Sequence, residues 1–102
     1  MNDTYKRWDI CIANVPFEDI AQSKPRPVLI LNTGAAIHIQ CLKMTGQPPR
    51  RGEYVLKKWR EAGLHKKTTV RIGKLLLIDI DQVFKKIGHL DKVDILNIEK
   101  LL

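Results

Sequence analysis

The segment Lys24-Pro25-Arg26-Pro27 leads directly into the apolar run 28–31. Each proline fixes its own φ, and Pro27 restricts Arg26 to an extended conformation. The apolar run is typical of a buried strand, so we expect Arg26 to be held at the edge of a rigid core. The planar guanidinium of arginine can donate two hydrogen bonds to one phosphate. The segment therefore predicts a fixed phosphate-binding cation, and the alternative is a solvated arginine on the loop before a strand.

The charge of the chain is concentrated in its middle. The 102 residues carry a net charge of +7, and residues 21–74 hold twelve basic and two acidic side chains. The flanking segments 1–20 and 75–102 are slightly acidic. This asymmetry favours a polyanionic partner, with nucleic acid first and an acidic protein second, over a generally soluble basic surface. The length is typical of a single domain over residues 1–102.

Composition also indicates the compartment. The polar start at residues 1–7 predicts no signal peptide, and no apolar stretch approaches the ~20 residues of a membrane span. Cys11 and Cys41 lie in apolar segments without a CxxC pattern, so we expect buried free thiols in a reducing compartment. The alternative is a disulfide between them, which the pattern does not indicate. No His, Cys or Asp cluster has the spacing of metal ligands. We therefore expect a cytoplasmic protein without membrane association, metal or cofactor.

Hydrophobic periodicity predicts five strands, over residues 8–14, 26–32, 36–45, 69–72 and 74–78. The second of these is apolar on both faces and should therefore be central. In the third, the outward positions change from His38 and Gln40 to Leu42 and Met44, which indicates a bulge or strong twist. These strands favour a mainly β protein with short α-helices: a small, SH3-like, curled antiparallel barrel of about five strands with a C-terminal helix.

Three short helices are predicted in the second half of the chain. The first spans 55–62 and stops at Gly63, and the second begins at Asp81 and ends near Gly88. Asp91 caps the final helix, with Asp94 in its first turn. The apolar side chains of this last helix cover more of its surface than one narrow face. We therefore expect part of the helix to pack on the barrel and the rest on a second subunit.

The order of these segments resembles the MazF/PemK family of toxins from toxin–antitoxin systems. The resemblance extends from Trp8 to the C-terminal helix, although Trp8 itself stands where the family usually has glycine. The stretches that carry it are Asp9-Ile10, Pro16-Phe17-Glu18-Asp19, Arg26-Pro27-Val28-Leu29, Thr45, Trp59-Arg60-Glu61-Ala62-Gly63-Leu64, Thr69-Val70-Arg71 and Lys86-Ile87-Gly88-His89-Leu90.

The resemblance implies a metal-independent, sequence-selective endoribonuclease that cuts single-stranded mRNA and thereby inhibits translation and growth. In such toxins the ribose 2′-hydroxyl attacks the adjacent phosphate, leaving a 2′,3′-cyclic phosphate and a 5′-hydroxyl. The family's site arginine and site Thr or Ser match Arg26 and Thr45. The resemblance also implies a homodimer whose groove binds RNA or the tail of an acidic cognate antitoxin.

Chemistry suggests a role for each candidate catalytic residue. A fixed Arg26 can stabilise the negative charge that develops on the phosphoryl oxygens. The Thr45 hydroxyl can hold a phosphoryl oxygen, or alternatively satisfy the local backbone. Glu18 is the first choice as general base, ahead of the three histidines. For RNA binding we expect a stacking aromatic and a set of polar and basic side chains: Phe17, Lys24, Gln47, Arg50, Arg51, His65 and Lys67.

The sequence is also compatible with two other functions. The same barrel could be a non-catalytic module that binds RNA or a protein, with Arg26 only as a phosphate clamp. It could also be an inhibitor of DNA gyrase, since a related toxin group shares the barrel. The pairing of Arg26 with Thr45 favours the ribonuclease, because a pure interaction module has no need of both residues together.

Overall fold

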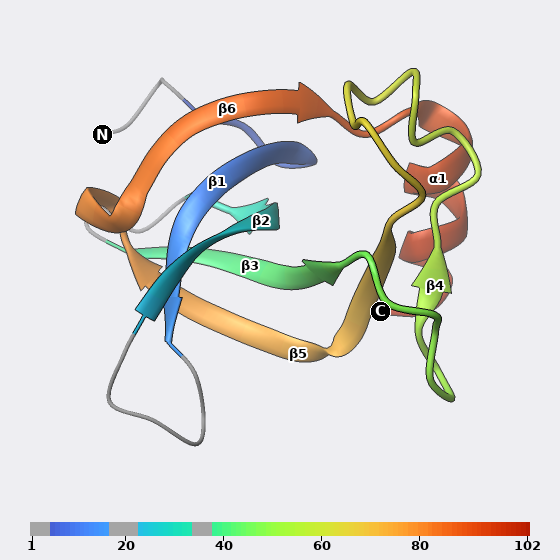
Figure 1. Cartoon of the computed structure of the whole chain (residues 1–102), viewed down its shortest axis with the longest axis horizontal. Coiled ribbons are helices and arrows are strands. Elements are labelled where there is room, and N and C mark those ends of the chain that lie inside the picture. Colours follow the sequence, from blue (N-terminus) through green and yellow to red (C-terminus); the bar gives the residue numbers. More distant parts are fainter. Residues whose placement is uncertain (1–4, 17–22, 34–37) are drawn as a thin grey trace.

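The computed structural model describes residues 5–16, 23–33 and 38–102 (Figure 1). In these ranges the chain forms a single antiparallel sheet with the strand order β4-β5-β3-β2-β1-β6. The elements are β1 (Asp9–Pro16), β2 (Ser23–Asn32), β3 (His38–Thr45), β4 (Tyr54–Val55), β5 (Thr69–Asp79), the 3-10 turn η1 (Ile80–Gln82), β6 (Val83–His89) and α1 (Lys92–Glu99). The expected mainly β fold with a C-terminal helix is confirmed, with six strands rather than five.

The sheet curls strongly, and β4 and β6 remain its two separate edges (Figure 1). The segment after β4 spans the gap between these edges, because the His89 N–H donates to the Ala62 carbonyl at 3.1 Å. Glycine is required at this contact, since a Cβ at Gly88 would collide with that carbonyl oxygen. The expected barrel is therefore an open, curled sheet whose edges are joined by an irregular segment.

β2 lies inside the sheet and is buried on both faces, as its continuous apolar sequence predicts. Val28 and Ile30 belong to one core cluster, whereas Leu29 belongs to a second cluster on the other face. The first cluster also contains the two cysteines, which are free and buried as expected. Burial raises the pKa of Cys11 and of Cys41 to about 12, so both thiols stay protonated.

The expected irregularity near Leu42 is confirmed. Cys41 and Leu42 are both buried although they are adjacent, and the register between β3 and β5 shifts between Leu42 and Lys43. Residues 72–74 of β5 are the additional residues at this shift. The prediction of two strands separated at Gly73 was therefore wrong, because β5 continues through the bulge as a single bent strand.

The predicted helix over 55–62 was also wrong. The chain leaves β4 in a series of turns, and the carboxylate of Asp94 accepts hydrogen bonds from the backbone N–H groups of Lys57 and Lys58 and from the Tyr54 hydroxyl. These contacts fix the segment against α1 in an irregular conformation. Gly63 nevertheless has the positive φ expected of a residue that ends a helical turn, at +97°.

The predicted helix from Asp81 to Gly88 was wrong as well. Only Ile80–Gln82 form a 3-10 turn, and the following residues form β6, which pairs with β1. The apolar spacing of Val83, Phe84 and Ile87 is compatible with one helix face, so periodicity alone could not decide. Residues 83–89 form a strand because their pairing with the edge of β1 satisfies the backbone N–H and C=O groups of both strands.

α1 begins at the predicted cap, since the Asp91 side chain accepts from the Val93 N–H at 2.9 Å. Ile98 and Asp94 face the core, while several large apolar side chains of the C-terminal region are exposed: Val93, Leu96, Leu101 and Leu102. Within the described part of the chain, no helix has the length and apolar character required to cross a membrane.

Trp8 adopts a backbone conformation that favours glycine. Its φ is +74°, and its side chain is only 9% exposed in the core. A non-glycine residue in this region is uncommon because Cβ crowds the backbone. The burial of the indole, with Arg7 over its ring at 4.7 Å, offsets that strain. Trp8 therefore lacks the conformational freedom that glycine has at this position, but its indole ring adds packing to the core.

A buried carboxylate connects β1 to the edge strand β6. The Asp9 side chain is fully buried and bonds His89 Nδ1 at 2.7 Å, Lys86 Nζ at 3.2 Å and the Lys6 N–H at 2.8 Å. Burial alone would raise the pKa of Asp9, but the hydrogen bonds from His89, Lys6 and Lys86 lower it below its ordinary 3.8. The ionised carboxylate of Asp9 is therefore the form that stabilises the folded state.

We expect Asp9 to make folding sensitive to acid. Because the folded-state pKa of Asp9 is lowered, its contribution to the free energy of unfolding is present above about pH 4. This contribution is lost as the pH falls through the folded-state pKa. Asp9→Asn should reduce the free energy of unfolding at pH 7 by about 2 kcal/mol and flatten its acid dependence. Urea unfolding between pH 3 and pH 7 measures both. An equal acid slope in the variant and the wild type would contradict this role.

Candidate active site

Arg26 and Thr45 lie where β2 and β3 part. The described pairing of the two strands runs from Asn32 to Val28, and Val28 is opposite Lys43. If this register continued by two residues, Arg26 would be opposite Thr45. Pro27 occupies the first position beyond the pairing, and a proline has no N–H to donate to a ladder. The strands therefore diverge there, with one candidate residue on each side of the opening.

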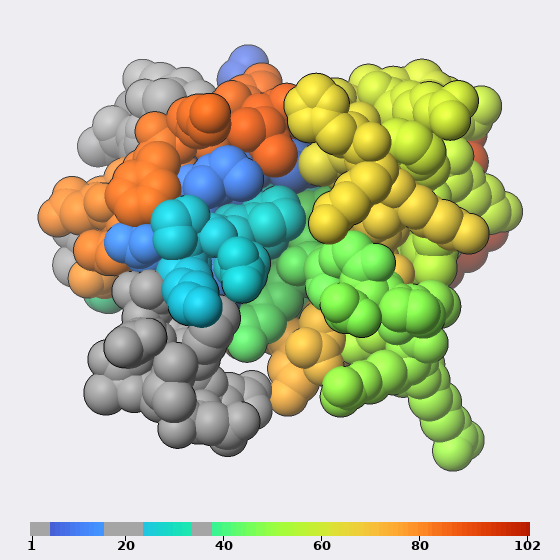
Figure 2. All heavy atoms as spheres, viewed as in Figure 1, coloured from blue at the N-terminus to red at the C-terminus, as the bar shows by residue number. Residues whose placement is uncertain are grey.

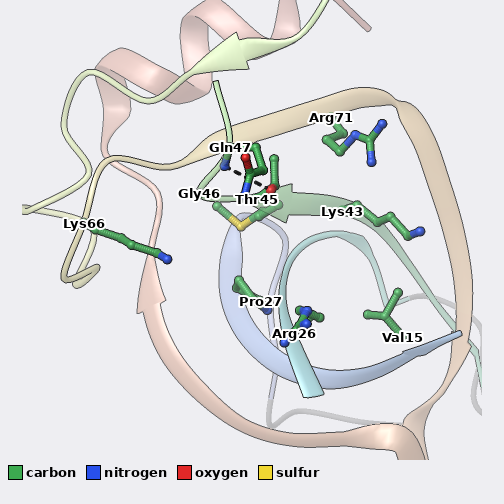
Figure 3. A pocket seen from close by; sticks show the side chains of 10 residues that line it. Val15, Arg26, Pro27, Lys43, Thr45, Gly46, Gln47, Lys66 and Arg71 are labelled. Carbon is green, nitrogen blue, oxygen red and sulfur yellow. Dashed lines mark hydrogen bonds between the residues drawn. The ribbon is translucent and has the colours of Figure 1, made fainter. Parts of the chain in front are cut away.

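A pocket of about 530 Å³ lies in this opening (Figure 3). The view shows side chains from β2, β3 and β5 around one cavity. Figure 2 shows the same face as a surface, where β2 (cyan) adjoins the end of β3 and the loop after it (green). Ten residues line the pocket: Val15, Arg26, Pro27, Lys43, Met44, Thr45, Gly46, Gln47, Lys66 and Arg71.

The pocket is strongly cationic. Among its described lining residues four are basic and none is acidic, so the local field favours an anion. Arg26 is exposed on β2, and its Nη1 donates to the carbonyl of Pro25 at 3.3 Å. Lys43 and Arg71 are opposite each other on β3 and β5. An arrangement of several cations and a hydroxyl is suited to a phosphodiester.

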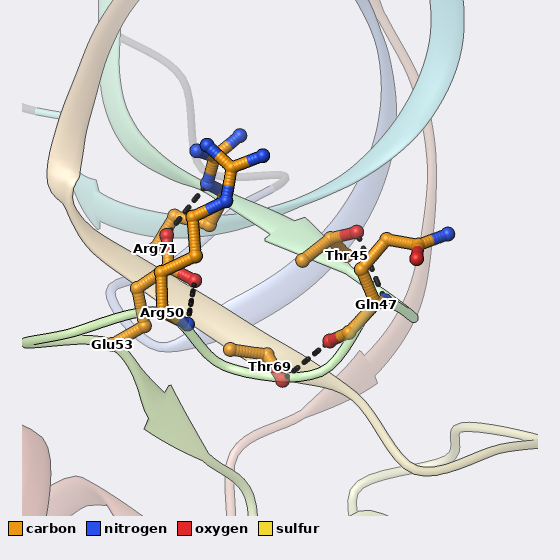
Figure 4. A network of polar contacts seen from close by, with 6 residues as sticks. All are labelled: Thr45, Gln47, Arg50, Glu53, Thr69 and Arg71. Atoms are coloured by element: carbon orange, nitrogen blue, oxygen red, sulfur yellow. Dashed lines mark hydrogen bonds and ion pairs between the residues drawn. The ribbon is translucent and has the colours of Figure 1, made fainter.

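The Thr45 hydroxyl is held by the local backbone. Its Oγ1 accepts from the Gln47 N–H at 3.2 Å, and Thr69, opposite Thr45 on β5, donates from its own hydroxyl to the Gln47 carbonyl at 3.0 Å (Figure 4). Both backbone groups of Gln47 are thus bonded by threonines. Because Thr45 Oγ1 acts as an acceptor here, its hydroxyl hydrogen can still be donated to an anion in the pocket. The local backbone role and a phosphate-binding role are therefore compatible.

Glu53 connects the loop after β3 to β5. Its Oε1 accepts from the Arg50 N–H at 2.9 Å, and its Oε2 accepts from Arg71 Nε at 2.7 Å (Figure 4). The hydrogen bond from the Arg50 backbone and then the one from the Arg71 side chain lower the pKa of Glu53. Glu53 is therefore a carboxylate near neutral pH, and it supports the Arg71 side chain at the pocket.

The remaining predicted site residues are distributed around this pocket. Gln47 lines it together with Thr45, and Lys67 lines a smaller neighbouring cavity that also contacts Gln47. Arg50 and Arg51 line a third cavity with Gly73 and Lys74, so they lie outside the main pocket. Four predicted residues do not line these cavities in the described structure: Lys24 and His65 are exposed, and Phe17 and Glu18 lie outside the described residues.

Lys43, Lys66 and Arg71 also line the pocket. The basic middle segment indicated Lys66 and Arg71 as contacts to an RNA backbone, whereas Lys43 had no predicted role. The alternation of β3 places Lys43 two residues before Thr45, and this spacing was the available signal. Lys66 reaches the pocket from the segment between β4 and β5, a tertiary contact that no local pattern encodes. Among the described residues, no three His, Cys, Asp or Glu side chains are grouped to hold a metal ion.

We expect substitutions at Arg26 and Thr45 to leave the fold intact. Arg26 is exposed, and within the described residues the Thr45 hydroxyl bonds an exposed backbone group. Arg26→Ala and Thr45→Val should therefore each change the free energy of unfolding by less than about 1 kcal/mol. Urea denaturation followed by circular dichroism measures this. A loss of several kcal/mol would show that the residue supports the fold rather than only lining the pocket.

The family is shown by sequence comparison. The model for PemK-like, MazF-like toxins of type II toxin–antitoxin systems matches residues 6–102. The match includes nearly the whole chain, and the protein therefore belongs to this toxin family. A search of curated protein sequences gives no significant match.

Solved structures share the fold at low sequence identity. The Mycobacterium tuberculosis toxin MazF-mt6 is 19% identical, with a TM-score of 0.74 over 91% of this chain and 90% of that chain. An endoribonuclease in complex with its cognate antitoxin, from a mycobacterial species, is 11% identical, with a TM-score of 0.76 over 94% and 88%. A further mycobacterial endoribonuclease is 10% identical, with a TM-score of 0.76 over 98% and 88%. At these identities the likeness establishes the fold.

Proposed function

We propose that this toxin is a metal-independent endoribonuclease that cuts single-stranded mRNA in the cytoplasm. The observation that carries the proposal is the pocket between β2 and β3, where four cationic side chains and the Thr45 hydroxyl surround one cavity without a described acidic residue. Membership of the toxin family and the fold shared with mycobacterial endoribonucleases support it.

In this proposal the ribose 2′-hydroxyl attacks the adjacent phosphate. The 2′-oxygen forms a bond to phosphorus, the bond to the 5′-oxygen breaks, and the departing 5′-oxygen takes a proton from solvent water. The products are a 2′,3′-cyclic phosphate and a 5′-hydroxyl. Arg26 stabilises the charge on the phosphoryl oxygens, and Thr45 donates a hydrogen bond to one of them. Glu18 is the candidate general base that takes the 2′-hydroxyl proton, and Phe17 is the candidate stacking residue.

The basic surroundings of the pocket are proposed to bind the RNA strand. Lys24, next to Arg26 on the same strand face, and Gln47 and Lys67, at the adjoining cavity, continue the polar surface of the pocket. Arg50 and Arg51 extend it along the loop, with exposed His65 as a further contact. An acidic segment of a cognate antitoxin would compete with RNA for this surface.

The protein is also proposed to form a homodimer. Several large apolar side chains are more than half exposed on β5 and β6, namely Leu75 at 58%, Leu77 at 64% and Phe84 at 52%. Together with the exposed apolar side chains of α1, they leave apolar surface that a second copy can bury. Sedimentation equilibrium of the purified protein tests this directly.

Arg26→Ala should abolish most of the cleavage. We expect discrete cuts by the wild type in a long unstructured RNA with EDTA present, and a rate lower by about 10²–10³-fold for the variant, since one charge-stabilising group is lost. Lys92→Ala, on α1 away from the pocket, is the matched control for loss of one positive charge. Equal rates for Arg26→Ala and the wild type would remove Arg26 from the site.

Intact RNA with the wild type would contradict the ribonuclease itself. That result would favour the non-catalytic RNA- or protein-binding role or a gyrase-directed role, and a supercoiling assay would distinguish the last of these.

Removal of both Arg50 and Arg51 should weaken RNA binding and reduce its salt dependence. Each phosphate contact on a single strand contributes about 0.7 to the slope of log K against log salt, so the double alanine variant should lower the slope by about 1.4. Fluorescence anisotropy with a labelled oligonucleotide measures this. The double variant Lys92→Ala, Lys100→Ala removes one charge from α1 and one from the residue that caps its C-terminus, and it should leave the slope unchanged. Equal slopes for both double variants would place Arg50 and Arg51 outside the RNA path.

A further inference from the structure

Glu53 is an acidic residue embedded in the most basic part of the chain. It is one of two acidic residues in segment 21–74, and its side chain is only 10% exposed. The other acidic residue, Glu61, is 52% exposed and pairs with Lys58 at 3.6 Å across one turn. The two glutamates therefore carry the same charge in different settings, and Glu61 provides a matched comparison for Glu53.

Both carboxylate oxygens of Glu53 are used. One accepts from the Arg50 N–H and the other from Arg71 Nε, while the Glu53 N–H donates to the Arg50 carbonyl at 3.0 Å. These contacts close the turn 50–53 and attach it to β5 (Figure 4). A single side chain thus fixes both the loop after β3 and the arginine at the pocket.

The contact through Nε has a directional consequence for Arg71. An acceptor at Nε occupies one edge of the planar guanidinium, an edge that Nε shares with one terminal nitrogen, and it leaves the end formed by the two terminal nitrogens open for another acceptor. Arg71 lines the same pocket as Arg26 and Thr45, and it lies opposite Lys43 on the neighbouring strand (Figure 3). Like charges opposite each other on a sheet repel, and the contact with Glu53 opposes that repulsion by holding the Arg71 side chain in place.

We propose that Glu53 is a positioning residue of the RNA-cleaving pocket, which holds the Arg71 guanidinium so that its terminal nitrogens face the bound phosphodiester. The inference rests on the proposed ribonuclease function. Glu53 itself does not touch the RNA; it acts through Arg71, whose charge is then fixed before the substrate binds.

Simple electrostatics makes the opposite prediction for removal of Glu53. A negative charge close to an RNA site weakens binding, so its loss should strengthen binding and leave the chemical step unchanged or faster. The positioning role predicts slower cleavage even though the protein becomes more positive. The sign of the change in kcat therefore separates the two accounts.

The test uses Glu53→Gln, with Glu61→Gln as the control of equal charge change. With a short RNA substrate at fixed salt, we expect kcat of Glu53→Gln to fall by about 10-fold or more, with KM unchanged or lower. Glu61→Gln should keep the wild-type kcat, and urea unfolding should show that both variants are folded. A kcat for Glu53→Gln at or above the wild-type value would overturn the proposal.

A double variant tests whether Glu53 acts through Arg71. In an Arg71→Gln background the further change Glu53→Gln should have almost no effect on kcat, because the group that it positions is already absent. Losses that multiply independently in the double variant would overturn the proposed route.

A measurement independent of cleavage separates this proposal from the proposed function. In a proton–nitrogen correlation NMR spectrum, the Arg71 Nε–H should be protected from exchange in the wild type and in Glu61→Gln, and unprotected in Glu53→Gln. If the wild-type protein does not cut RNA, both the ribonuclease function and the role of Glu53 in cleavage are refuted. If the Arg71 Nε–H is equally protected in all three proteins, the orientation of Arg71 by Glu53 is refuted, and the ribonuclease function is not affected.

Discussion

The absence of an N–H on Pro27 is the constraint on which the site depends. Backbone pairing between β2 and β3 reaches Val28, and the next residue of β2 cannot donate to a neighbouring strand. The strands part at that point, and the opening contains side chains from β2, β3 and β5. Arg26 and Thr45 face the same cavity because a continued register would have placed them opposite each other.

Buried carboxylates hold the two ends of the sheet. Asp9 attaches β6 to β1, and Asp94 attaches the segment after β4 to α1, in each case through several hydrogen bonds. A fully buried charge is stabilising only when its acceptors are satisfied in this way. Glu53 applies the same principle at the pocket, where it bonds a cation and a loop. The basic surface around the pocket is therefore held in place by three hydrogen-bonded carboxylates, those of Asp9, Asp94 and Glu53.

The sequence predicted the features that local patterns encode. The double-sided burial of β2, the cap at Asp91 and the irregularity near Leu42 follow from apolar periodicity and capping chemistry. β6 and the turns after β4 were missed because their apolar spacing also fits a helix and because long-range pairing decided the outcome. Lys66 and the Glu53–Arg71 contact join segments that are distant in sequence, so no local pattern could predict them. The roles of Arg26, Thr45 and Glu18 remain predictions from family resemblance and chemistry.

The most direct test of the account is a crystal structure of the protein with an RNA strand that carries a single 2′-deoxy nucleotide at the cut position. This substrate lacks the attacking hydroxyl, so it should bind without being cut. We expect the phosphate after the deoxy nucleotide to lie between β2 and β3, within hydrogen-bond distance of the Arg26 guanidinium and the Thr45 hydroxyl. Cleavage at the deoxy position, or a bound strand that passes outside this pocket, would contradict it.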